Sequence, residues 1–109
     1  MAHSVNQVKG SDEFYRFYRE LKPGSVERKV VDSGLDELKV NATAGKKIHR
    51  PQWPPYYVRK YRVTNLWKLD LSRGARMIYT VLSEKGQRIV VVLEAFLTHK
   101  EYETRFGYC

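Results

Sequence analysis

Residues 67–82 read WKLDLSRGARMIYTVL, and this stretch decides what kind of sheet the chain can build. Trp67–Leu71 alternates apolar and charged residues, a period of two that is typical of a strand with one buried and one solvated face. Ser72-Arg73-Gly74 is a turn sequence, so Ala75–Leu82 is expected to return as a second, antiparallel strand. The core of the predicted fold is therefore a β-meander.

A third strand and several helices are predicted around this meander. A turn at Ser83–Gly86 precedes the apolar run Ile89–Leu93, which lacks alternation and is expected to be an interior strand with both faces covered. Upstream, Ser11 and Ser25 are expected to cap two amphipathic helices that end near residues 21 and 40 and form a helical hairpin. His99–Phe106 is expected to be a short helical tail. The prediction is one α+β domain over residues 1–109, with the hairpin packed on a small antiparallel sheet.

Composition limits the chemistry that the chain can perform. The three histidines are far apart and the single cysteine is Cys109, so we expect neither a metal site nor a cofactor, and we expect the thiol to be inert. No apolar run approaches the roughly 20 residues that span a bilayer. The first residues also lack the apolar core of a secretory signal, so we expect no membrane association and a cytoplasmic location.

The net charge of +8 is concentrated in one tract. Lys46–Tyr79 holds nine basic residues against the single acid Asp70, and aromatic residues are interleaved with them. Such a tract predicts a nucleic-acid surface, with cations for phosphates and rings for bases, although charge runs often serve only to solvate a face. Its prolines predict an extended basic loop over Lys46–Tyr57, followed by one helical turn from Pro55 to Tyr61.

Arg76 stands in an otherwise apolar strand, where an unpaired guanidinium would cost several kcal/mol. Two interpretations remain open: it pairs with Asp70 on the neighbouring strand, or it lines an anion site. In the tail, His99 and Tyr102 share a helix face, with Arg105 a turn farther along. An imidazole, a phenol and cations are the groups that metal-free RNA cleavage requires, although an isolated surface histidine is more often inert.

The segment Trp67–Tyr79 and the motif His99–Tyr102 resemble the RelE/ParE superfamily of toxins from type II toxin-antitoxin systems. The resemblance implies ribosome-dependent cleavage of messenger RNA without a metal, and inhibition by a cognate antitoxin. It implies that Arg76 stabilises phosphate and that His99 or Tyr102 transfers a proton. Basic residues would hold RNA; those predicted are Lys46, Lys47, Arg59, Lys60, Arg62, Arg73 and Arg105.

Two features depart from the family pattern. Only His3–Val8 could supply the strand that usually precedes the first helix, and the proline-rich segment Arg50–Tyr57 is unusual. The alternative function is a non-catalytic protein of the same fold that binds gyrase, RNA or a protein partner.

Overall fold

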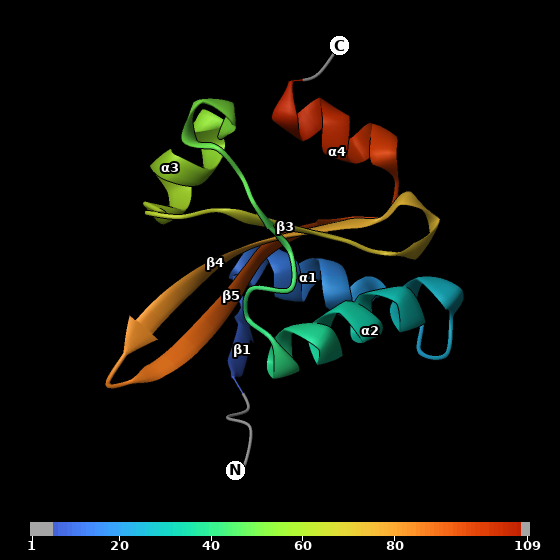
Figure 1. The fold of residues 1–109 in the computed structure, drawn as a ribbon. Helices are drawn as coiled ribbons and strands as arrows, with labels where there is room; N and C mark the ends of the chain where they lie inside the picture. The colour runs from blue at the N-terminus through green and yellow to red at the C-terminus, as the bar shows by residue number, and fades with distance from the viewer. Residues whose placement is uncertain (1–5, 108–109) are drawn as a thin grey trace.

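The computed structural model describes residues 6–107, and a five-stranded sheet is its centre (Figure 1). The strand order is β1-β5-β4-β3-β2. The strands are β1 (Gln7–Gly10), β2 (Lys46–Lys47), β3 (Trp67–Asp70), β4 (Arg76–Glu84) and β5 (Gln87–Phe96). Neighbouring strands are antiparallel except for β1, which runs parallel to β5. The predicted α+β class is confirmed. Strand β1 overlaps the candidate segment His3–Val8 at Gln7 and Val8, and residues 3–5 of that segment lie outside the described residues.

Helices cover both faces of this sheet (Figure 1). The predicted hairpin is present as α1 (Asp12–Glu20) and α2 (Val26–Val40), and each begins after a serine whose side chain accepts a backbone N–H. On the other face lie α3 (Pro55–Tyr61) and α4 (His99–Phe106). No helix within residues 6–107 has the length and apolar character needed to cross a membrane.

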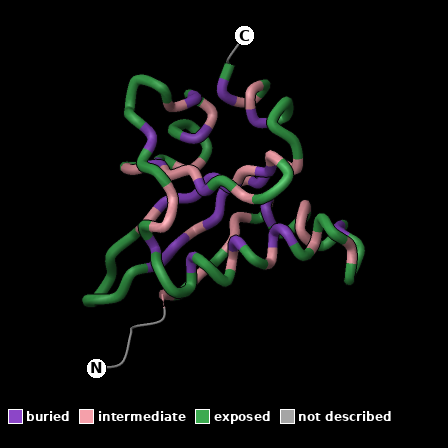
Figure 2. The backbone as a smooth tube through the Cα atoms, turned by 45° about the vertical axis from the view of Figure 1, so that its right-hand side comes forward, coloured by how far each residue is buried: buried purple, intermediate pink, exposed green. Residues whose placement is uncertain are grey.

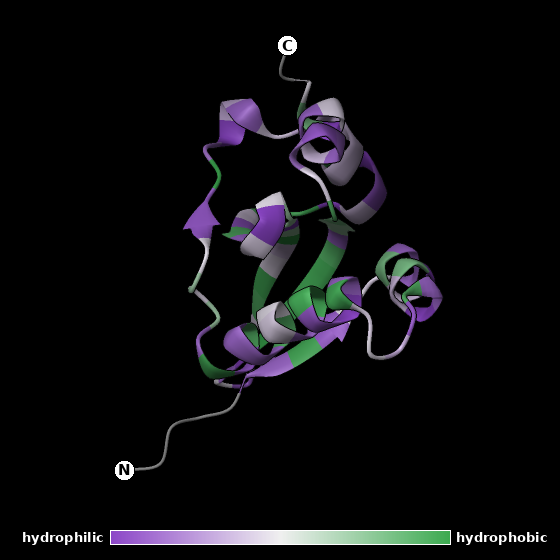
Figure 3. Ribbon diagram, turned by 90° about the vertical axis from the view of Figure 1, so that its right-hand side faces the viewer, coloured by the Kyte–Doolittle hydropathy of each residue, from purple (hydrophilic) through white to green (hydrophobic). Residues whose placement is uncertain are grey.

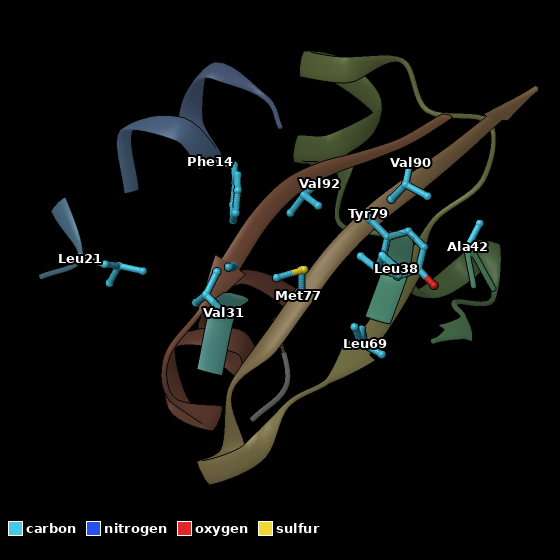
Figure 4. Packing of buried hydrophobic residues seen from close by; sticks show 11 residues of the cluster. Phe14, Leu21, Val31, Leu38, Ala42, Leu69, Met77, Tyr79, Val90 and Val92 are labelled. Carbon is cyan, nitrogen blue, oxygen red and sulfur yellow. The ribbon is translucent and has the colours of Figure 1, made fainter. Parts of the chain in front are cut away.

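Two apolar clusters, one on each face, hold these layers together. The first joins α1 and α2 to the sheet through residues such as Phe14, Leu38 and Met77 (Figure 4). The second joins α3 and α4 to the opposite face through Tyr57 and Phe106. Figure 2 shows buried positions where the sheet and the helices meet, and Figure 3 shows apolar stretches along the strands and on the helices that pack on them. Strand β5 contributes to both clusters, as its unbroken apolar run predicted.

A β-bulge in β5 decides which face its polar residue joins. Ile78 pairs with Glu94 and Tyr79 pairs with Val92, so Leu93 is an extra residue. The insertion reverses the alternation beyond it, and Glu94 faces α3 and α4 instead of the helical hairpin. The carbonyl of Leu93 accepts a hydrogen bond from Ser11 Oγ at 2.8 Å, so the bulge is tied to the start of α1.

The basic segment differs from the prediction of an extended loop over Lys46–Tyr57. Lys46 and Lys47 form β2, an edge strand that pairs with β3, and Arg50–Gln52 forms a short 3₁₀ helix, η1. The edge strand forms because the backbone of the segment closes on β3 at both ends. Gly45 lies so close to β3 that an added Cβ would be 2.3 Å from the Lys68 carbonyl oxygen, and the Ile48 N–H donates to the Leu66 carbonyl at 2.8 Å.

Candidate active site

Arg76 is the first residue of β4, and its register partner on β3 is Asp70. The Arg76 Nε lies 3.0 Å from Asp70 Oδ1, and the Arg76 side chain is 17% exposed. This ion pair was one of the two interpretations that the sequence left open. It engages only one edge of the guanidinium, because the two Nη groups point to other partners.

His99 lies beside that guanidinium, at the first residue of α4. Thr98 caps the helix in a capping box with Glu101, which fixes where the helix begins. Arg76 Nη2 is 3.1 Å from His99 Nδ1, and His99 Nε2 is 3.3 Å from Glu103 Oε2. Arginine is always a donor, so Nδ1 must be the acceptor and the imidazole proton lies on Nε2, facing Glu103. The imidazole is thus held between a cation and a carboxylate.

The loop before β4 brings these two residues together. The 3₁₀ helix η2 (Ser72–Gly74) ends at Gly74, whose φ of 78° belongs to the left-handed region that glycine adopts without strain. A Cβ added there would lie 3.8 Å from the His99 backbone nitrogen. The turn predicted from Ser72-Arg73-Gly74 therefore lies against the beginning of α4.

The Tyr102 ring lies beneath the Arg76 guanidinium. Tyr102 is 3% exposed and packs among Phe96 and Phe106. The Arg76 guanidinium lies 5.4 Å from the centre of its ring, and the Lys68 Nζ lies 5.6 Å from it. A phenol ring attracts cations over its face, so Tyr102 supports two positive groups at once.

Lysines extend the positive charge along the sheet edge. Lys46 on β2 is directly opposite Lys68 on β3. Like charges at such a position destabilise a sheet, and a local conflict of this kind is expected where a site serves an anion. Lys46, Lys47, Gln52, Lys68 and Tyr102 line one small pocket of about 140 Å³. The pocket is large enough for a phosphate group, and three of its lining residues are lysines.

Comparison with solved structures shows which known fold this sheet and its helices share. Two structures of the E. coli toxin RelE match over nearly the whole chain. The free toxin carrying two arginine-to-alanine substitutions is 20% identical, with a TM-score of 0.52, over 94% of this chain and 95% of that one. The isolated toxin is 21% identical, with a TM-score of 0.57, over 93% of this chain and 98% of that one. This chain has a RelE-like fold. No family model and no curated protein matches its sequence.

Within the RelE-like fold, the predicted residues separate into two groups. Arg76, His99 and Tyr102 meet at one site, and Lys46 and Lys47 line the pocket beside it. The others lie elsewhere. These are Arg59 and Lys60 on α3, Arg62 at its C-cap, Arg73 in η2 and Arg105 on α4.

Two of the predicted RNA-binding cations are engaged by acids inside the protein. Arg105 donates twice to Glu94, at 3.0 Å each, and its guanidinium lies 3.9 Å above the Tyr56 ring. Lys60 Nζ lies 3.5 Å from Glu13 and donates to the Tyr56 hydroxyl oxygen at 3.0 Å, and this hydrogen bond raises the pKa of Lys60. These contacts join α1, α3, α4 and β5, so both cations serve the packing of the helices.

Three residues of the site were missed from the sequence: Gln52, Lys68 and Glu103. Lys68 alternates with the apolar residues of its strand and lies two residues before Asp70, on the same face, and this alternation was the available signal. Glu103 is four residues after His99, the spacing at which two side chains meet on a helix. Gln52 gave no signal, because only the turn of η1 brings it to the lysines. Within residues 6–107, no three His, Cys, Asp or Glu side chains group as metal ligands would.

Proposed function

We propose that this protein is the toxin of a toxin-antitoxin system and that it cleaves messenger RNA on the ribosome without a metal ion. The observation that carries the proposal is the 3.1 Å contact between Arg76 Nη2 and His99 Nδ1, next to a pocket lined by three lysines. The RelE-like fold supports it. The proposed partners are the ribosome, messenger RNA and a cognate antitoxin, all in the cytoplasm.

The proposed reaction uses the neighbouring 2′-hydroxyl of the RNA as the nucleophile. An RNA phosphate that enters the pocket attracts the Arg76 guanidinium, which then releases the lone pair of His99 Nδ1. The imidazole takes the proton of the 2′-hydroxyl, the 2′-oxygen bonds to phosphorus, and the bond from phosphorus to the 5′-oxygen breaks. The 5′-oxygen takes a proton from a water molecule as it leaves, and the other product ends in a 2′,3′-cyclic phosphate.

Charge stabilisation is the second requirement of this reaction. The pentacoordinate phosphorus carries additional negative charge, and a preorganised cation beside it contributes about 10²–10³ in rate. Arg76 is positioned by Asp70 and by the Tyr102 ring, and Lys68 shares that ring. In this proposal Tyr102 supports the cations, and the imidazole of His99 transfers the proton.

The non-catalytic alternative is favoured by one observation, the ion pair between Arg76 and Asp70. In that case Arg76 would be a structural residue, and the protein would act by binding gyrase, RNA or another protein. The two functions differ in what they require of His99, which is exposed and has no part in the apolar core.

In vitro translation with primer extension on the message tests the proposal. The wild type should cut the message, and the double variant Arg76→Ala with His99→Ala should not. Arg19→Ala removes an exposed arginine from α1 and should cleave like the wild type. Translation arrest by the folded double variant equal to that of the wild type would exclude the nuclease and leave the binding function.

A further inference from the structure

A second pocket lies next to the proposed active site, in the proline-rich segment that follows β2. It has a volume of about 430 Å³. Its lining consists of Lys47, Ile48, His49, Arg50, Trp53 and Thr64. Lys47 and Ile48 also line the pocket that contains Tyr102, so the two hollows share a wall.

Hydrogen bonds hold the aromatic residue of this second pocket in place. Trp53 Nε1 donates to the Ile48 carbonyl at 2.8 Å, and the Trp53 backbone N–H donates to the Arg50 carbonyl at 3.0 Å. Pro51 stands inside η1 and the buried Pro54 follows Trp53, which restricts the backbone on both sides. The indole is therefore half-buried with a fixed orientation.

The charged residues that line this pocket, Lys47 and Arg50, are both positive. The Arg50 guanidinium lies 5.0 Å from the centre of the Trp53 ring, and Lys47 stands on the wall shared with the other pocket. Residues 38–69 contain no aspartate or glutamate at all. A planar ring, a stacked guanidinium and a lysine form the combination that holds an unpaired nucleotide, because the ring and the guanidinium stack on the base while the ammonium binds phosphate.

We propose that the pocket of Arg50 and Trp53 is a base-stacking subsite for one unpaired nucleotide of RNA. This inference rests on the proposed function: with the scissile phosphate at Arg76, the shared Lys47 holds the phosphate of the adjoining nucleotide, whose base stacks in the second pocket. Apolar docking of a protein segment fits less well, because four of the six lining residues are polar or basic.

Intrinsic fluorescence measures this subsite directly. The chain has two tryptophans, so Trp67→Phe leaves Trp53 as the only indole, and His99→Ala in the same protein prevents cleavage. A short single-stranded RNA should quench the Trp53 emission with saturation, and the same backbone without bases should not. The reciprocal protein, with Trp53→Phe, reports Trp67, whose ring stacks on Tyr79, and should show no saturable quenching.

The Arg50→Ala variant tests the stacking without disturbing the core, because Arg50 is exposed. Removing one stacking partner should weaken RNA binding about tenfold or more. Arg19→Ala, which removes the same charge from α1, should bind as before. Circular dichroism of each variant verifies the fold.

The possible outcomes separate this inference from the proposed function. Saturable quenching by RNA supports the subsite even if the wild type never cuts a message, in which case only the nuclease proposal fails. Absence of quenching by RNA overturns the subsite even if the wild type cuts. Quenching by a polyglutamate peptide and not by RNA also overturns it, because the pocket would then serve an acidic protein segment.

Discussion

Arg76 Nη2 lies 3.1 Å from His99 Nδ1, and this contact joins the first residue of β4 to the first residue of α4. It also sets the imidazole tautomer, because a guanidinium can only donate. The Nε2–H is then left for Glu103 at 3.3 Å. The order cation, imidazole, carboxylate prepares Nδ1 to accept a proton once a phosphate attracts the arginine.

Removal of the carboxylate should disturb this arrangement. In Glu103→Ala the imidazole loses the acceptor of its Nε2–H, and we expect cleavage of the message to fall about tenfold or more, within the range of a general base. Because Arg76 still donates to Nδ1, nitrogen NMR shifts of the His99 ring should show the same Nε2–H tautomer as in the wild type. Thr104→Ala, on the same helix, should change neither cleavage nor tautomer. Unchanged cleavage by Glu103→Ala would contradict the role of Glu103.

Neutralising the partner of Arg76 separates its two possible roles. Asp70 is 52% exposed, so Asp70→Asn should reduce the free energy of unfolding by about 1 kcal/mol or less. The amide oxygen that replaces the carboxylate oxygen can still lie beside Arg76 Nε, so the guanidinium keeps its position without a competing negative charge, and we expect cleavage to be retained or increased. Urea denaturation and primer extension measure both effects. Loss of cleavage in a folded Asp70→Asn protein would contradict this expectation and show that the negative charge of Asp70 is needed to hold Arg76 in place.

The Arg105 guanidinium should contribute more to stability than to RNA binding. Arg105→Ala would leave Glu94, whose side chain is 12% exposed, with the Tyr57 hydroxyl as its one side-chain donor within residues 6–107. Loss of two charge-assisted hydrogen bonds predicts a decrease of about 2–3 kcal/mol in the free energy of unfolding. Urea denaturation checks this, with exposed Arg59→Ala as the control that loses the same charge from α3. Equal stability of the two variants would contradict it.

The raised pKa values of two tyrosines, Tyr57 and Tyr61, predict a loss of stability at alkaline pH. Burial and the hydrogen bond to Glu13 raise the pKa of Tyr61 from 10.0 to about 12, and burial with the charge of Glu94 raises the pKa of Tyr57 further. Folding thus retains protons that the unfolded chain releases above pH 10, so stability should be full below pH 10 and should fall as pH rises through 12.

Tyrosinate absorbance and circular dichroism during a pH titration check this prediction. The stability of Tyr61→Phe should fall less steeply as the pH rises, because the substitution removes one titrating group. If the stability of Tyr61→Phe falls with pH as steeply as that of the wild type, Tyr61 does not contribute to the alkaline loss of stability.

Gly45 should be intolerant of any side chain. A Cβ would lie 2.3 Å from the Lys68 carbonyl oxygen and 2.9 Å from the Tyr79 hydroxyl. Gly45→Ala should therefore separate β2 from β3 and cost about 1–3 kcal/mol or more. Gly24→Ala meets nothing within 4 Å and bears only the strain of its positive φ, about 1–2 kcal/mol. Thermal denaturation compares the two, and equal stability of both variants would contradict the close approach.

RNA binding is a second measurement for the Gly45 substitution, because the pocket lined by Lys46, Lys47 and Lys68 depends on the position of β2. Moving β2 takes Lys46 and Lys47 away from Lys68. A Gly45→Ala protein that remains folded should therefore bind RNA less well than Gly24→Ala does.

The sequence alone determined the fold class and most of the secondary structure, because these follow from local patterns; β2 and η1 were the exceptions. The alternation in Trp67–Leu71, the serines that cap both helices and the unbroken apolar run in β5 each reflect burial or hydrogen bonding within a few residues. The proximity of Tyr102 to His99 also followed from helix geometry, since three residues bring two side chains to one face.

Only the tertiary structure decided which charges are available at the site. Nine basic residues between Lys46 and Tyr79 look alike in the sequence, and Arg105 and Lys60 were expected to hold RNA. The bulge at Leu93 turns Glu94 toward Arg105, and the helix layers bring Glu13 to Lys60. Electrostatic pairing depends on distances between residues far apart in the chain, so no local pattern could show that Arg105 and Lys60 are held by acids of other elements.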